Sequence, residues 1–121
     1  MNNDLSLAEQ NIVMCKKGTP PMEREKIAEF LELLPEWYVE DDSGVSQLVR
    51  NYEFADVAEA VKFSAFVKAM ADEANHHPLL HVEGNTLNVR WWTHTIKGLH
   101  LNDFIIAARC DELYRDNCVN V

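Results

Sequence analysis

Hydrophobic and polar positions follow a helical spacing early in the chain. In "PMEREKIAEFLELLPEW" the apolar residues at this spacing are Ile27, Phe30, Leu31 and Leu34. Pro21 suits a first helical turn and Pro35 ends the run, so the pattern predicts a helix between these two prolines. Residues 1–20 show little periodicity, and we expect them to form a flexible N-terminal tail.

Two pairs of extended segments come next, each pair separated by a turn. "WYVEDDSGVSQLVRNYEF" contains the turn signal "DDSG" and predicts a first hairpin. "LLHV" and "TLNVRWWT" flank "EGN" and predict a second. In this second hairpin, apolar Leu87, Val89 and Trp91 alternate with polar residues, which predicts one buried face and one polar face.

The clearest helical pattern lies between the hairpins, in "FADVAEAVKFSAFVKAMADEAN". Asp56 can cap its start, with Glu59 three residues later as a capping-box partner. Its apolar stripe consists of Ala60, Phe63, Val67, Met70 and Ala74. We expect the helix to end near Asn75, because the residue before Pro78 favours extended geometry.

A last helix is predicted in "NDFIIAARCDELYRDN", with Asn102 or Asp103 near its start. The resulting order, α-β-β-α-β-β-α, predicts an α+β fold in which three helices cover one face of a four-stranded antiparallel sheet. A length of 121 residues favours a single domain, placed at residues 21–121. The other sheet face would be open, and Trp92 could lie on it. An open face or a free edge strand favours self-association.

Charge and composition exclude several classes of function. Acidic residues outnumber basic ones by 20 to 11, which disfavours binding to nucleic acid or to anionic membranes. No apolar run reaches the roughly 18 residues of a membrane span, and the N-terminus does not read as a secretory signal. Cys15, Cys110 and Cys118 leave an odd thiol, so a reducing cytoplasm is the expected location.

The histidines are the main candidates for chemistry. His76 and His77 end the central helix, and His94 ends the strand that returns towards it, so the three imidazoles could line one cleft. Imidazoles suit proton transfer near neutral pH. They could instead be surface residues at a helix end, which is our expectation for His81 and His100. A zinc site is a further alternative, although neighbouring histidines are poorly placed to bind one ion and no HExxH or cysteine pair supports them.

Other side chains could support these histidines. Asp72 and Glu73 precede the pair by a helical turn, and they are either a solvated helix face or carboxylates that orient an imidazole. Trp91 and Trp92 should face opposite ways, so one belongs to the core. The other could stack on a flat ring or lie in a subunit contact. Cys110 falls in a helix that should pack, so its thiol is expected to be inert.

These residues form a recognisable pattern. Asp72 is followed by His76-His77-Pro78, then by Thr93-His94 and finally by Asp103. This spacing resembles the pterin-4a-carbinolamine dehydratase family, and "WWTHTIKGLHLNDFIIAARCDELY" is especially similar to bacterial members linked to phenylalanine hydroxylation. The resemblance extends roughly from Pro21 to Tyr114.

The resemblance implies an activity. Family members dehydrate 4a-hydroxytetrahydropterin (the pterin-4a-carbinolamine) to quinonoid dihydropterin and water, and so recycle the tetrahydrobiopterin cofactor of aromatic amino acid hydroxylases. They use no metal and no organic cofactor, and they assemble as dimers or tetramers. By the same resemblance the partners are the pterin, further copies of the chain and phenylalanine hydroxylase. Some relatives instead act as dimerisation partners of a transcription factor or as assembly factors, so the alternative is a binding or regulatory protein on the same fold.

The family's catalytic histidines correspond to His76, His77 and His94. We expect His77 and His94 to form the acid–base pair, with His76 in a binding or supporting role. Asp103 would either orient His94 or cap the last helix. The residues expected to bind or support the substrate are Asp72, Glu73, Pro78, Trp92, Thr93 and Asp103.

Overall fold

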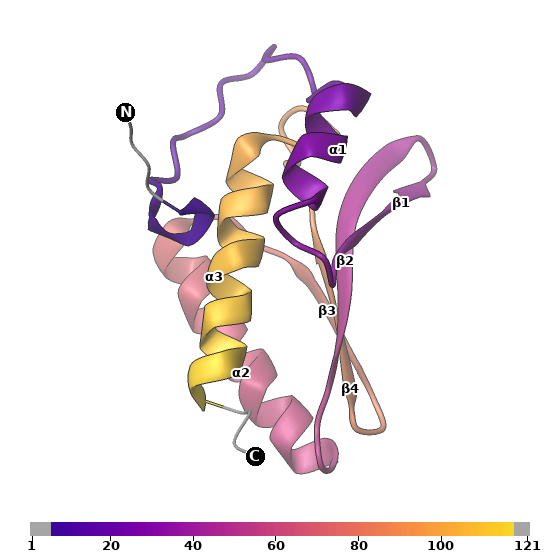
Figure 1. Cartoon of the computed structure of the whole chain (residues 1–121), viewed down its shortest axis with the longest axis vertical. Helices are drawn as coiled ribbons and strands as arrows, with labels where there is room; N and C mark the ends of the chain where they lie inside the picture. The colour runs from indigo at the N-terminus through magenta and orange to yellow at the C-terminus, as the bar shows by residue number, and fades with distance from the viewer. Residues whose placement is uncertain (1–5, 118–121) are drawn as a thin grey trace.

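An antiparallel sheet forms one layer of the protein, and helices form the layer beside it (Figure 1). The structure is a computed structural model that describes residues 6–117. The elements are η1 (Leu7–Glu9), α1 (Arg24–Leu31), β1 (Tyr38–Asp42), β2 (Val45–Glu53), α2 (Val57–Ala74), β3 (Leu79–Glu83), β4 (Thr86–Trp91) and α3 (Leu101–Asn117). The strand order is β1-β2-β4-β3 with every pair antiparallel. The predicted single-domain α+β fold is confirmed, with the short η1 as an addition.

Both hairpins turn at the predicted positions. Ser43 and Gly44 join β1 to β2, with φ angles of 54° and 86°. Positive φ at both central residues is typical of the type I′ turn, one of the two common two-residue hairpin turns. Gly84 and Asn85 join β3 to β4, with a positive φ of 62° at Gly84 and none at Asn85. Each turn fixes the register of its hairpin, and the second one aligns Leu80 opposite Val89.

The core lies between the helices and one face of the sheet. Leu87, Val89 and Trp91 of β4 are fully buried, which confirms the predicted alternation along this strand. On α2 the predicted residues Ala60, Phe63 and Val67 are buried. Ala71, which was not predicted, is buried as well, whereas the predicted Met70 and Ala74 pack only at the edge of the core. No helix among residues 6–117 has the length and apolar character that crossing a membrane requires.

The first helix is shorter than the prolines suggested. α1 begins at Arg24, so Pro21 lies before it. A Cβ atom added to Gly98 would come within 2.8 Å of the Pro21 Cβ, and the Met22 N–H donates to the Leu99 carbonyl at 2.8 Å. The prediction that Pro21 belongs to the first turn was therefore wrong, because this residue packs against the loop before α3 instead.

The residues before α1 contact α3, where the sequence predicted a flexible tail over residues 1–20. The Val13 N–H donates to the side chain of Asn102, which donates back to the Val13 carbonyl. Arg109 donates to the carbonyls of Ala8 and Gln10. The segment from residue 8 to residue 13 is thus attached to the folded domain through its backbone. Residues 1–5 lie outside the described residues.

A buried carboxylate links the sheet to α3. Asp111 accepts hydrogen bonds from the Trp37 indole at 3.0 Å, from Arg50 at 2.7 Å and from the Tyr52 hydroxyl at 2.6 Å. Burial is the main reason that the pKa of Tyr52 is raised, so this hydroxyl keeps its proton and donates it to Asp111. The three donors come from β2 and from the residue before β1, and the cluster fastens this side of the sheet to the last helix.

Candidate active site

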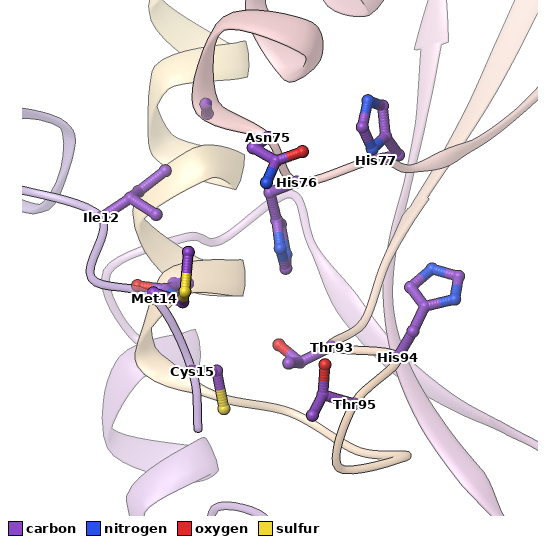
Figure 2. A pocket seen from close by; sticks show the side chains of 11 residues that line it. Ile12, Met14, Cys15, Asn75, His76, His77, Thr93, His94 and Thr95 are labelled. Atoms are coloured by element: carbon purple, nitrogen blue, oxygen red, sulfur yellow. The ribbon is translucent and has the colours of Figure 1, made fainter. Parts of the chain in front are cut away.

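A cavity of about 700 Å³ opens at the C-terminal end of α2 (Figure 2). Its lining comes from the N-terminal segment, the end of α2, the loop after β4 and the start of α3. His76, His77 and His94 all line it, so the hairpin does return its far end to the end of the helix. The size lies in the range of small-molecule sites in proteins.

The local structure at the end of α2 explains why the two neighbouring histidines diverge. Asn75 adopts the left-handed conformation, with φ 54° and ψ 43°, and the His76 N–H donates to the Ala71 carbonyl at 3.1 Å. Asparagine tolerates this conformation, and such a residue ends a helix sharply. The predicted helix end was right, but Asn75 ends the helix, before Pro78 can. The chain then turns so that the imidazoles leave it in different directions (Figure 2).

His76 is the most enclosed of the three histidines. Its side chain is only 11% exposed, and its Nε2 lies 2.6 Å from Oδ1 of the fully buried Asp103. The ring stacks on Trp91, with centroids 5.8 Å apart and planes within 9°. A carboxylate accepts hydrogen bonds, so Nε2 carries the hydrogen in this pair. The imidazole is therefore fixed in position and in tautomer.

Of the two roles expected for Asp103, the structure shows the cap of the last helix and not the orientation of His94. Asp103 contacts His76 rather than His94, so the predicted orientation of His94 by this carboxylate was wrong. Its second oxygen accepts from the Thr93 hydroxyl at 2.8 Å and from the His100 N–H at 3.0 Å. The bond to the backbone of His100 is a cap at the start of α3, as the alternative prediction had it. Asp103 thus joins the loop after β4, the start of α3 and the first histidine.

His77 lies at the solvent-exposed side of the cavity. Its Nε2 is 3.0 Å from Oδ1 of Asp72, one helical turn earlier, and the other Asp72 oxygen is 2.9 Å from the Lys68 ammonium. The hydrogen bond from Lys68, assisted by that from His77, holds the pKa of Asp72 below its usual value. Glu73 is exposed and does not line the cavity, so of the two predicted carboxylates Asp72 is the one that meets an imidazole.

His94 lies on a tight loop closed by a bridge between Thr93 and Gly98, where the Thr93 N–H donates to the Gly98 carbonyl at 2.9 Å. Its exposed ring stacks on Trp92, with centroids 4.5 Å apart and planes 26° apart. Within residues 6–117 neither ring nitrogen has a hydrogen-bond partner. Of the two adjacent tryptophans, Trp91 is the one buried in the core, and Trp92 stacks under the imidazole of His94.

The remaining polar candidates lie outside the cavity. His81 is exposed on the open sheet face near Glu83, and His100 accepts the Asn102 N–H at the start of α3. Pro78 is half-buried and does not line the cavity. Among the described residues, no three His, Cys, Asp or Glu side chains are grouped as a metal ion would require.

The N-terminal side of the cavity was not predicted from the sequence. Ile12, Met14 and Cys15 line it together with Asn102, although all but Asn102 fall in the predicted tail. A signal was present, since "IVMC" is an apolar run inside an otherwise polar segment. Periodicity could not detect it, because a short segment without regular structure has no repeating pattern.

The fold and the cavity define a class of protein: a small α+β domain with a histidine-lined site suited to proton transfer. A profile described as pterin 4 alpha carbinolamine dehydratase matches residues 20–113. The chain belongs to the pterin-4-alpha-carbinolamine dehydratase family.

Individual relatives agree with this assignment. A Chlorobium luteolum protein named as a candidate pterin-4-alpha-carbinolamine dehydratase is 42% identical over 86% of this chain and 91% of its own length. A Saccharophagus degradans protein with the same name is 41% identical over 89% of this chain and 96% of its own length. The crystal structure of a transcriptional coactivator/pterin dehydratase from Brucella melitensis has a TM-score of 0.68 at 24% identity, covering 77% of this chain and 97% of that one. This last likeness supports the fold.

Proposed function

We propose that this protein is a 4a-hydroxytetrahydrobiopterin dehydratase, in which His77 and His94 transfer protons and His76 supports them. The observation that carries the proposal is the convergence of three imidazoles on one cavity, two of them held by carboxylates. Family membership supplies the substrate class and the reaction type. The reaction removes water from the carbinolamine and yields quinonoid dihydropterin, which a reductase can return to the hydroxylase cofactor.

The chemistry needs one proton donor and one proton acceptor. The C4a–O bond breaks, and a protonated imidazole gives its proton to the departing hydroxyl, which leaves as water. A neutral imidazole takes the proton from N5, and the electron pair of that N–H bond forms the C4a=N5 double bond. Protons balance, because the one given at the hydroxyl equals the one taken from N5. Each well-placed transfer typically contributes about 10²–10⁴ in rate.

The environments of the histidines support this division of labour. His77 and His94 are exposed to the cavity, so a bound ring can reach both. His76 has its Nε2 engaged by Asp103 and one face covered by Trp91, which suits it to holding the substrate. Thr93 and Trp92 act as supports, since the first binds Asp103 and the second lies under His94.

A coupled assay tests the proposal. The protein is added to a pterin-dependent phenylalanine hydroxylase, and the decay of the 4a-hydroxypterin intermediate is followed by its absorbance. The wild type should accelerate the decay, and His77→Ala or His94→Ala should lower kcat/KM about 10²–10⁴-fold. His81→Ala is the matched control, because this exposed histidine lies outside the cavity and should leave the rate unchanged. An unaccelerated decay with the wild type would reject the dehydratase function, and a stoichiometric co-purifying protein would then favour the binding alternative.

The same proposal includes the context of the enzyme. It uses no cofactor and acts on the pterin product of phenylalanine hydroxylase. It lies in the cytoplasm, where Cys15 and Cys110 stay free thiols.

The proposal also includes an assembly, a homodimer or homotetramer. In support, β1 and β3 are the edge strands of the described sheet, and Tyr38 and Leu79 are exposed on them. Light scattering on the purified protein tests the assembly, and a monomer mass would contradict it.

A further inference from the structure

The cavity has two chemically different sides. The end of α2 and the loop after β4 supply imidazoles and hydroxyls, whereas most of the apolar lining comes from Ile12, Met14 and Cys15, with Ala74 as an addition. We call Ile12, Met14 and Cys15 the apolar wall. Figure 2 shows the apolar wall along one side of the cavity, His77 and His94 on the other, and His76 between them. Residues 12–15 precede the part of the chain that the family profile matches, residues 20–113.

Side chains of α3 hold this segment in place by its backbone. Asn102 forms a reciprocal pair with Val13, accepting its N–H at 3.1 Å and donating to its carbonyl at 2.6 Å. Arg109 lies two helical turns further along the same face of α3 and donates to Ala8 at 3.0 Å and Gln10 at 2.6 Å. Because the attachment uses main-chain groups, it leaves the side chain of Met14 available for a ligand, whereas Ile12 also packs against the edge of the core.

Met14 is the most exposed member of the apolar wall. Its relative exposure is 81%, which is high for a large apolar side chain beside a cavity. A thioether packs well against aromatic rings and adapts to their shape. A pterin is a flat bicyclic ring with polar edges and apolar faces, so it offers both the edge that the imidazoles need and a face that Met14 can cover.

We propose that the apolar wall is a specificity-determining contact for the pterin, with Met14 as its main residue, and that Arg109 is a positioning residue that holds it there. The inference rests on the proposed function for the identity of the ligand. The imidazoles then act on C4a and N5 while Met14 packs on the ring, away from the reacting atoms. An interaction of this kind stabilises the bound substrate and the transition state equally, so it appears in KM.

A matched pair of variants tests the contact. Met14→Ala should raise KM about fivefold with kcat within about twofold of wild type. Val13→Ala is the control, since this neighbouring apolar side chain is also exposed, at 64%, but does not line the cavity. Its KM should equal that of the wild type. Equal KM values for the two variants would overturn the proposal.

The positioning role of Arg109 needs a separate readout, because this residue does not line the cavity. Arg109→Ala should raise KM with little change in kcat, and the double variant Met14→Ala/Arg109→Ala should raise it no further than Met14→Ala alone. Additive effects, or a fall in kcat at constant KM, would show that Arg109 acts through general stability. Thermal melting of each variant shows whether it is folded at the assay temperature.

Binding of oxidised biopterin separates this inference from the proposed function. Quenching of biopterin fluorescence by the protein needs no turnover, so it reports on the apolar wall even when dehydratase activity is absent. Met14→Ala should weaken this binding severalfold relative to Val13→Ala. Equal affinities of the two variants would overturn the proposed role of the apolar wall. If Met14→Ala binds biopterin more weakly but the wild type has no dehydratase activity, the proposed role of the wall stands and only the proposed reaction is rejected.

Discussion

At the scale of single residues, His76 and His77 show how neighbours in sequence acquire different properties. His76 is enclosed between Trp91 and the buried Asp103, and His77 is exposed beside Asp72. Each imidazole therefore has its own carboxylate, one in the interior and one in solvent. The buried carboxylate matters more, because an interaction that water cannot replace is stronger than an exposed one.

Asp103→Asn tests the buried partner. The amide keeps the size of the side chain but loses its charge. Its one oxygen is needed on the side where Thr93 and His100 donate, so its amino group faces His76 and donates where the carboxylate accepted, and His76 loses its fixed tautomer. We expect kcat to fall about tenfold to a hundredfold, less than on loss of a proton-transferring histidine. The coupled assay measures this. Asp72→Asn serves as the comparison, and a fall of equal size in that variant would contradict the ranking.

The pKa of Asp72 leads to a prediction about stability. Because this pKa is lowered in the folded protein, the charged carboxylate stabilises the fold above its ordinary value of 3.8, and this contribution disappears as the pH falls through the lower folded value. The urea midpoint of the wild type should exceed that of Asp72→Asn at pH 6, and the difference should shrink towards pH 3. A difference that grows on acidification would contradict the assignment.

The three histidines of the cavity were predictable from the sequence, but not all of their hydrogen-bond partners were. Histidine is a chemically distinctive residue. The helical periodicity places His76 and His77 at the end of α2, and the length of the second hairpin places His94 just after β4. Asp103 lies 27 positions after its partner His76 in the sequence. A contact between residues so far apart depends on the tertiary fold, and no local sequence pattern predicts it. One of the two roles expected for Asp103, orienting His94, failed for this reason, whereas the other, a cap at the start of α3, follows from local sequence and was right.

At the scale of elements, the two hairpins and the long helices follow from local rules, and the ends of α1 do not. Alternation and turn residues determine the hairpins. Pro21 is compatible with a first helical turn, yet its contact with Gly98 gives it another role, so tertiary packing overrides the local preference. The N-terminal segment is a similar case, because side chains from the distant α3 supply its hydrogen bonds.

The cluster around Asp111 is expected to be the strongest polar link between elements. Asp111→Ala leaves Arg50 charged and largely buried without its carboxylate, so the free energy of unfolding should fall by about 3–5 kcal/mol. Glu40→Ala is the control, since its ion pair with Arg90 lies on the more exposed sheet face, and it should cost about 0–1 kcal/mol. Urea denaturation followed by tryptophan fluorescence measures both. Similar losses for the two variants would refute the central role of Asp111.

At the scale of the whole molecule, the helix-covered face of the sheet stabilises the fold, and one end of that layer carries the site. The cavity draws on four segments from residue 12 to residue 102, so it exists only when the entire domain is folded. The sequence predicts this two-layer architecture well, because the order of elements leaves few ways to cover the sheet.

The reactivity of Cys110 can show whether the whole domain unfolds as one unit. Its thiol is fully buried in α3, and burial raises its pKa to about 12, so at pH 8 it is protonated and inaccessible. In a Cys15→Ser/Cys118→Ser variant, where Cys110 is the remaining thiol, a disulfide reagent at pH 8 should react only as fast as the molecule unfolds globally. The labelling rate should therefore rise with urea in parallel with unfolding. Rapid labelling of the native protein would show that α3 opens locally.

Only two residues, His76 and His77, lie between the left-handed Asn75 and Pro78. The length of this junction limits which insertions and deletions the protein can tolerate. Adding or removing one residue there would rotate the side chains that follow, so that neither imidazole would meet its own carboxylate. Substitutions in the surrounding helix alter packing by degrees, whereas a change of length at this point would break both partnerships at once. For natural variation and for protein engineering alike, the length of this junction is a stricter requirement than the identity of most residues near it.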